Sequence, residues 1–235
     1  MDIYTINLTA LLGLCGALFY MQKSQSQSQA AATKPTDKNS KTQKQTPPSS
    51  SQWPFLAVYT LVMASDWLQG PFLYSLYHDE HGLAPSLIST LFTTGFLSGA
   101  ASGSVIGSLA DRHGRKAACL FFCGAYGLSC VLTTLGATPL LFAGRILGGL
   151  GTSLLFSVFE SWMVTDFHAK RKGLGGDLSR TFGLMSTLNS VVAILSGVGS
   201  EWLVSASGTR KAPFAASVVL LIAAAGIIAT QWVST

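Results

Sequence analysis

The sequence predicts an all-α protein that spans a membrane, because the chain is too apolar and too poor in charge to face water. Of its 235 residues, 49% are hydrophobic and 11% are charged, whereas soluble domains carry about 25% charged residues. Its mean hydropathy is +0.43. Its apolar residues gather into runs of about 20, the length that a helix needs to cross the hydrocarbon of a bilayer. We therefore expect a lipid bilayer to surround most of the chain.

Seven apolar runs are predicted as membrane helices. Proline opens three of them, at Pro85, Pro139 and Pro213, where its missing N–H breaks no helical hydrogen bond. Their interiors are rich in glycine, which lets the backbones of membrane helices approach closely. The predicted helices cover residues 3–21, 53–77, 87–110, 117–136, 139–163, 182–204 and 213–232.

Residues 22–52, between the first two predicted helices, have a different composition. They include no aliphatic residue larger than alanine, so they cannot bury enough apolar surface to fold. We therefore expect three parts: an N-terminal anchor helix over 1–21, a disordered cytoplasmic tether over 22–52, and a six-helix unit over 53–235.

The first apolar run could instead be a cleaved signal peptide. The residues before it, Met1 and Asp2, carry no positive side chain, whereas Lys23 follows the run. This polarity favours an uncleaved anchor with its N-terminus outside.

Lysine and arginine lie mainly on one side of the predicted bundle. Twelve of the fifteen fall in the tether, in the loop after the third helix, and around the loop after the fifth helix. Because cytoplasmic loops are enriched in these residues, we expect this side and the C-terminus to be cytoplasmic. Arg210 and Lys211 depart from the pattern, since they fall on the opposite side.

Several other classes of function find little support in the sequence. The basic residues lie in short loops without interleaved aromatic residues, which argues against nucleic-acid binding. No His/Asp/Ser constellation, metal-ligand cluster or phosphate-binding loop appears, so we expect no enzyme activity, no cofactor and no metal. His78 and His81 flank two acidic residues on an outer loop and are expected to be solvated rather than metal-bound.

The cysteines are expected to be small packing residues within membrane helices. Two of them lie one helical turn apart and could in principle share a soft metal ion, although packing is the favoured interpretation. The four cysteines are Cys15, Cys119, Cys123 and Cys130.

The strongest motif is GSLADRHGRK at residues 107–116, in the loop between the third and fourth helices. It matches the G-x-x-x-D-R-x-G-R-K signature of the major facilitator superfamily at every specified position. An ordinary positive loop would explain the basic residues but not the spaced glycines and aspartate. We predict that this segment latches one conformation on the cytoplasmic side, with Glu160 as a partner rather than part of a proton relay. The predicted latch comprises Gly107, Asp111, Arg112, Gly114, Arg115, Lys116 and Glu160.

A second match is RILGGLG at residues 145–151, which resembles the superfamily's R-x-x-x-G-x-G pattern. An arginine within a membrane span is costly and should face the bundle interior or an aqueous cavity. Asp66, at a similar depth, is the obvious counter-charge, so one interpretation is a structural Asp66–Arg145 ion pair. The other is an anion site, because arginine presents forked donors to oxyanions. In that site Arg145 would attract the substrate, while Asp66 and Gln69 would tune the cavity.

The sequence resembles the molybdate-anion transporter family within this superfamily. The resemblance rests on the segment DWLQGP at 66–71, on GRILGG at 144–149 and on FSVFESW at 156–162. It implies two inverted three-helix repeats that form the N-terminal half of a major facilitator fold, preceded by one extra helix. It also implies a plasma-membrane carrier that takes up molybdate by alternating access.

The chain departs from the family in length, because family members have two six-helix halves with the substrate site between them. Only the first half is recognised here, so the missing C-terminal half is an expected partner, in cis or in trans. Two alternatives remain open. One is a carrier of another solute, such as a sugar or a drug, and the other is a non-transporting scaffold or receptor that interferes with a full-length carrier.

Overall fold

The structure is a computed structural model that describes residues 53–170 and 178–232. The chain divides into two units, Met1–Pro47 and Pro48–Thr235, and the description below concerns the second. The predicted anchor helix and tether lie outside the described residues.

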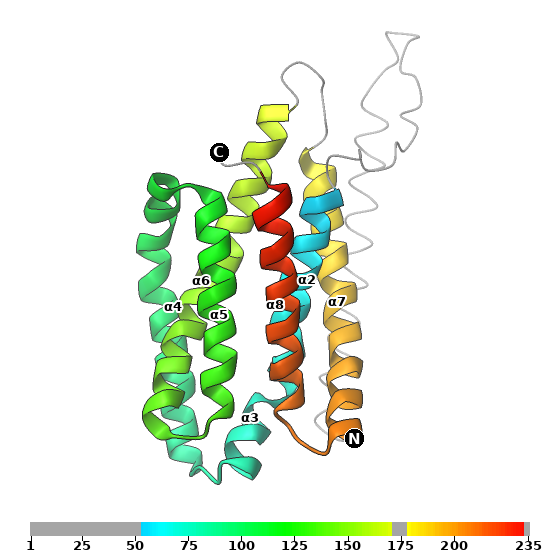
Figure 1. The fold of residues 1–235 in the computed structure, drawn as a ribbon. Helices are drawn as coiled ribbons and strands as arrows, with labels where there is room; N and C mark the ends of the chain where they lie inside the picture. Colours follow the sequence, from blue (N-terminus) through cyan, green and yellow to red (C-terminus); the bar gives the residue numbers. More distant parts are fainter. Residues whose placement is uncertain (1–52, 171–177, 233–235) are drawn as a thin grey trace, which may run out of the picture. The chain divides into compact units, whose positions relative to one another are not determined.

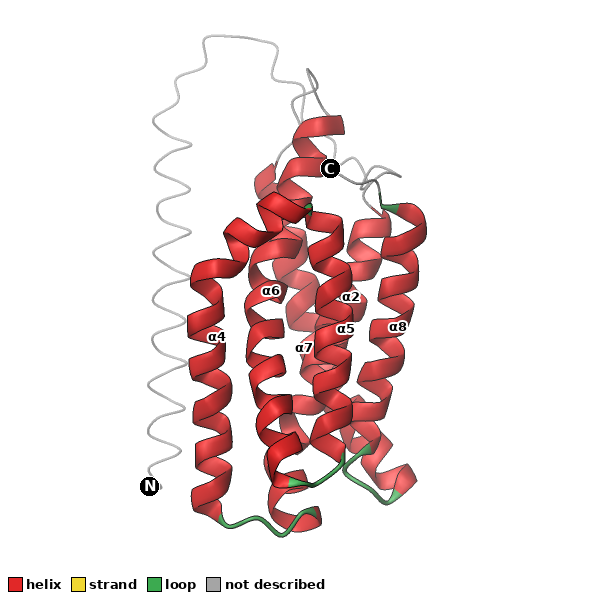
Figure 2. Cartoon of the chain, turned by 60° about the vertical axis from the view of Figure 1, so that its left-hand side comes forward, coloured by secondary structure: helices red, strands yellow, loops and turns green. Residues whose placement is uncertain are grey.

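The described residues fold into helices joined by short loops (Figures 1 and 2). Six long helices correspond to the six spans predicted between residues 53 and 232, with ends that differ by a few residues. They are α2 (Trp53–Gln69), α4 (Pro85–His113), α5 (Arg115–Thr134), α6 (Thr138–Lys170), α7 (Leu178–Ser207) and α8 (Ala212–Gln231).

The predicted continuous helix over 53–77 is interrupted. After α2, the chain passes through the 3-10 turn η1 (Gly70–Phe72), the short α3 (Leu73–Ser75) and the π-helical η2 (Leu76–Glu80). Pro71 accounts for the interruption, because its ring would clash with the carbonyl four residues earlier in a regular α-helix. The break allows η1 and α3 to contribute to a cavity described below.

Four of the helices are long and apolar enough to cross a membrane by length and composition: Arg115–Thr134, Thr138–Thr165, Thr181–Ser207 and Ala212–Gln231. Helix α2 has 17 residues before the break at Gly70. Helix α4 has 29 residues, but many of them are glycine, serine or threonine. Length and composition therefore identify α2 and α4 as membrane spans less clearly than they identify the other four helices.

The helices pack in a symmetric order. Helix α4 packs on α6, α6 on α5, α5 on α8, α8 on α2, and α2 on α7. Exchanging α2, α4 and α5 for α6, α7 and α8, respectively, maps this set of pairs onto itself: the α5–α8 pair is unchanged, and each other pair becomes another member of the set. Because successive helices alternate in direction and each repeat has three helices, the second repeat runs inverted relative to the first. This is the internal symmetry that many transporters possess.

Glycine and serine bring the backbones of α4 and α6 into direct contact. A Cβ added to Gly149 would lie 2.8 Å from the backbone nitrogen of Gly99. Serine hydroxyls bond across the same interface, from Ser98 to the Ile146 carbonyl at 2.7 Å and from Ser153 to the Gly99 carbonyl at 2.6 Å. Small residues with interhelical hydrogen bonds are typical of helix packing in a bilayer.

The loops at the end opposite Gly114 are tied together by charge. Arg210 Nη2 lies 3.0 Å from Asp79 Oδ2. Thr209 Oγ1 donates to Glu80 Oε1 at 3.0 Å, and the Arg210 N–H donates to the same oxygen. The side chain of Arg210, which departs from the lysine and arginine bias of the sequence, is therefore paired with Asp79, while Glu80 accepts hydrogen bonds from its backbone and from Thr209.

Candidate substrate cavity

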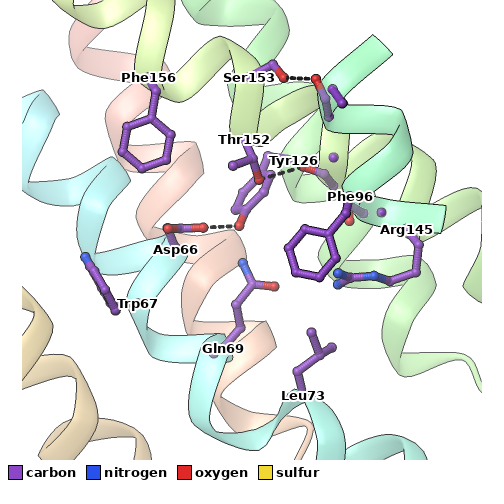
Figure 3. Close-up of a pocket in the computed structure, with 17 residues that line it drawn as sticks. Asp66, Trp67, Gln69, Leu73, Phe96, Tyr126, Arg145, Thr152, Ser153 and Phe156 are labelled. Carbon is purple, nitrogen blue, oxygen red and sulfur yellow. Dashed lines mark hydrogen bonds between the residues drawn. The ribbon is translucent and has the colours of Figure 1, made fainter. Parts of the chain in front are cut away.

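A cavity of about 590 Å³ lies among α2, α4, α5 and α6 (Figure 3). Helices α2, α4, α5 and α6 all contribute to its wall, together with η1 and α3. The polar residues that line it are Asp66, Gln69, Tyr126, Ser129, Arg145, Thr152 and Ser153. The large apolar residues that line it are Trp67, Leu73, Phe96 and Phe156.

The structure brings together the three residues that the sequence predicts for substrate binding. Asp66 and Gln69 reach the cavity from α2, and Arg145 reaches it from α6 (Figure 3). These residues are far apart in the sequence, and the cavity is the place where the two inverted repeats contribute to one wall.

Arg145 lies in a cradle formed by α4. Its guanidinium carbon is 5.1 Å from the centre of the Phe92 ring, a cation–π contact. A Cβ at Gly95 would lie 2.9 Å from Arg145 Nη2, so glycine at this position lets the guanidinium rest against the α4 backbone. Arg145 Nε is buried without a hydrogen-bond partner. Among the described residues no carboxylate forms an ion pair with Arg145, so its positive charge is available to a ligand.

The structural Asp66–Arg145 ion pair that the sequence allows does not form in the described bundle. Asp66 instead accepts a hydrogen bond from the Tyr126 hydroxyl (Figure 3). Tyr126 comes from α5, and its ring packs against Gly151 of α6, where a Cβ would lie 2.4 Å from a ring carbon. The partner of the Asp66 carboxylate is thus a phenol and not the guanidinium.

The two glycines of the R-x-x-x-G-x-G match therefore have different roles. Gly149 admits the backbone of α4, whereas Gly151 admits the Tyr126 ring that binds Asp66. Because neither glycine has a side chain, α4 and the Tyr126 ring can both lie close to α6, near Arg145.

Gln69 is held by its own helix and by α5. Its Nε2 donates to the Ser65 carbonyl at 3.3 Å, and the Cys130 thiol lies 3.7 Å from its Oε1. The thiol contact assigns Cys130 to packing beside the cavity. Cys119 and Cys123 are also buried and free of disulfides.

The predicted latch residues lie away from the cavity. Gly107, Asp111 and Arg112 are in the last turns of α4, and their side chains lie outside the described residues. Gly114 reverses the chain with a φ of +89°, a conformation that favours glycine.

The other three latch residues lie on α5 and α6. Lys116 Nζ donates to the carbonyls of Trp232 at 2.7 Å and Ala229 at 3.0 Å, which caps the end of α8. Glu160 is exposed on α6. Arg115 begins α5 beside Gly114.

Sequence reasoning missed Tyr126, Gly95 and Phe92. A tyrosine in the middle of the apolar run 117–136 is a signal that could have indicated a hydroxyl partner for a buried carboxylate. Nothing in the sequence pairs Gly95 or Phe92 with Arg145, because that contact depends on the depth at which α4 and α6 cross.

Comparisons with known proteins agree with this architecture. Residues 9–235 match the model of a major facilitator family described as sugar transporters with 12 transmembrane helices. No solved structure matches the chain.

Three curated relatives are molybdate-anion transporters. The protein from Takifugu rubripes is 34% identical over 204 residues, which cover 80% of this chain and 41% of that protein. The one from Danio rerio is 34% identical over 76% of this chain and 37% of its own length. The one from Xenopus tropicalis is 33% identical over 77% of this chain and 40% of its own length. The chain thus spans about two fifths of the relatives that it matches, and it belongs to the major facilitator superfamily, in the molybdate-anion transporter family.

Proposed function

We propose that the chain forms the N-terminal half of a secondary transporter that takes up a small oxyanion, with molybdate as the first candidate. The observation on which this rests is Arg145, a cation that lines a cavity between membrane helices and has no carboxylate partner among the described residues. Forked N–H donors in a poorly hydrated site suit a tetrahedral oxyanion. The names of the curated relatives support molybdate as the substrate.

The proposed mechanism is alternating access around this cavity. Arg145 attracts the anion, while Asp66 and Gln69 shape the opposite wall. The two halves of the carrier then rock about the site, and the segment from Gly107 to Lys116, with Glu160, latches the cytoplasmic side. We place the N-terminus outside and the C-terminus in the cytoplasm on the basis of the lysine and arginine distribution, and the chain in the plasma membrane on the basis of its resemblance to the molybdate-anion transporter family.

A second six-helix half is the proposed partner, in cis or in trans. Two aromatic residues that line the cavity support this proposal, because Phe96 is 75% exposed and Phe156 is 54% exposed. Because both side chains line the cavity, a second half that closed the cavity would cover them.

Uptake in cells that lack their own molybdate carrier tests the proposal. The chain is expressed alone and together with the C-terminal half of a curated relative, and molybdate accumulation is measured. We expect uptake by the combination that tungstate inhibits and sugars do not. Loss of uptake in Arg145→Ala, with Arg210→Ala as a matched control outside the cavity, assigns the role to Arg145. Unchanged uptake in Arg145→Ala would refute it.

A sugar carrier is the second candidate, favoured by the description of the matching family. The aromatic residues Trp67 and Phe96 in the lining could stack on a sugar ring. Inhibition of uptake by sugars, with none by tungstate, would select this candidate. If the chain transports nothing but lowers molybdate uptake by a co-expressed full-length carrier, it acts as an interfering half.

A further inference from the structure

Two buried polar atoms next to the cavity have no hydrogen-bond partner among the described residues. They are Arg145 Nε and the hydroxyl oxygen of Tyr77, whose side chain is fully buried. A buried donor or acceptor without a partner costs free energy, and native structures leave few of them. Unsatisfied groups that persist at a candidate binding site call for a functional explanation.

The two atoms belong to one cluster of side chains around Phe92. The guanidinium carbon of Arg145 lies 5.1 Å from the centre of the Phe92 ring. The Tyr77 ring meets the same Phe92 ring edge-on, with 6.3 Å between the centroids. The Arg145 guanidinium and the Thr133 hydroxyl both act on the Tyr77 hydroxyl, although neither is aligned to form a hydrogen bond with it.

The backbone around Tyr77 is held in place without help from the hydroxyl. Tyr77 lies in η2, a π-helical segment, and such segments are frequent at functional sites. Asp79 of η2 is paired with Arg210 at 3.0 Å. Just after η2, His81 Nε2 donates to the Thr133 carbonyl at 3.0 Å. The buried hydroxyl is therefore not needed to anchor this segment.

We propose that Tyr77 positions Arg145 for the oxyanion, because its hydroxyl accepts a hydrogen bond from Arg145 Nε in the loaded protein. The inference rests on the proposed function. Figure 3 shows the end of the Arg145 side chain pointing into the cavity, whereas Nε is buried. The anion thus meets the two terminal nitrogens, and Nε is left to a protein acceptor.

The acceptor can in turn be satisfied by Thr133. The Thr133 hydroxyl already donates its hydrogen to the Ser129 carbonyl at 2.9 Å, so its oxygen is free to accept one from Tyr77. Each group would then donate to the next, from Arg145 Nε to Tyr77, Thr133 and Ser129. Packing gives the guanidinium its direction, and this chain of hydrogen bonds keeps it there when the anion pulls on it.

Removal of the Tyr77 hydroxyl separates this role from a structural one. Molybdate affinity and the midpoint of thermal unfolding without ligand are measured for the 235-residue chain in lipid nanodiscs. In Tyr77→Phe we expect affinity to fall about tenfold, because a hydrogen bond to a charged group is lost. The midpoint should stay equal or rise, because the hydroxyl lost has no partner in the empty protein.

Tyr74→Phe is the matched control. Tyr74 lies on α3 and is 51% exposed, so loss of its hydroxyl should change neither quantity. A lower midpoint in Tyr77→Phe would show that the hydroxyl stabilises the empty protein, and an unchanged affinity would show that it does not serve binding. Either result would overturn the inference.

The same substitution in an Arg145→Lys background tests whether Tyr77 acts through Nε. Lysine keeps the positive charge but has a methylene group where arginine has Nε–H. We expect Tyr77→Phe to change affinity by less than about twofold in this background. An equal loss in both backgrounds would overturn the inference while leaving the anion site intact. No molybdate binding by the wild type would overturn the proposed function, and this inference with it.

Discussion

At the scale of single residues, the orientation of Arg145 depends on a glycine in a neighbouring helix. Gly95 leaves room for the guanidinium against α4, and the Phe92 ring supports it from one side. Packing against these two residues thus orients the guanidinium, while its buried Nε has no hydrogen-bond partner among the described residues. The cavity therefore presents a cation whose direction is fixed before any ligand arrives, which lowers the entropic cost of binding.

Gly95→Ala is expected to weaken oxyanion binding without unfolding the protein. The added methyl group would meet the end of the flexible Arg145 side chain at 2.9 Å, so the guanidinium moves and the backbone does not. We expect affinity for molybdate to fall by about tenfold, the equivalent of about 1.4 kcal/mol. Gly103→Ala, on the same helix, is the control, because its methyl group would meet only Ser153 Oγ at 3.8 Å. Equal affinities in both variants would contradict this role for Gly95.

The sequence could predict which residues line the cavity, but not all of the contacts between them. Asp66, Gln69 and Arg145 could be identified because charged and polar side chains within apolar runs are costly and stand out. The Tyr126 contact could not be predicted, because it depends on the rotation of α5 about its axis. The Asp66–Arg145 ion pair, one of the two interpretations that the sequence left open, does not form, because equal depth in the membrane does not place two side chains on facing surfaces.

At the scale of helices, glycine contacts decide which pairs approach closely. The six long helices could be predicted from their apolar runs, and four of them are long and apolar enough to cross a membrane. The interruption at Pro71 and the pairing of α4 with α6 depend on local backbone geometry, which hydropathy does not record. Glycine-rich runs in both helices indicated close packing but not which helices would meet.

Gly149→Ala is expected to destabilise the α4–α6 contact. Its methyl group would lie 2.8 Å from the Gly99 backbone nitrogen, and backbone cannot move aside as a side-chain terminus can. Overpacking of this kind costs about 1–3 kcal/mol, so we expect a lower midpoint of thermal unfolding in detergent. Gly226→Ala in α8 is the control, because nothing lies within 4 Å of its added Cβ. A midpoint as high as that of the control would show that the interface can separate without cost.

We predict that the contact between η2 and the loop that carries Arg210 weakens in acid. The hydrogen bond from His78, together with the positive charge of Arg210, lowers the pKa of the exposed Asp79 carboxyl. A carboxyl with a lowered pKa stabilises the fold above its ordinary pKa and loses this contribution as the pH falls through the lowered value. We therefore expect hydrogen exchange at the backbone amide of Arg210 to rise in acid below about pH 4. Asp79→Asn should already exchange fast at neutral pH, and an acid response that persists in this variant would implicate Glu80 instead.

At the scale of the whole molecule, two inverted three-helix repeats place one cation and one carboxylate on the walls of a single cavity. The cation comes from the second repeat and the carboxylate from the first. Family membership accounts for the architecture, whereas the chemistry of the cavity comes from this chain's own residues. The central claim is that Arg145 makes this cavity an oxyanion site.

A direct binding titration tests that claim. Molybdate is titrated into the 235-residue chain in lipid nanodiscs, with tungstate and a neutral sugar as competitors. We expect saturable binding that tungstate displaces and the sugar does not. Arg145→Ala should weaken binding by tenfold to a hundredfold, because a charge-assisted hydrogen bond contributes about 1.5–3 kcal/mol. Binding of equal strength in Arg145→Ala, or displacement by the sugar alone, would contradict the account.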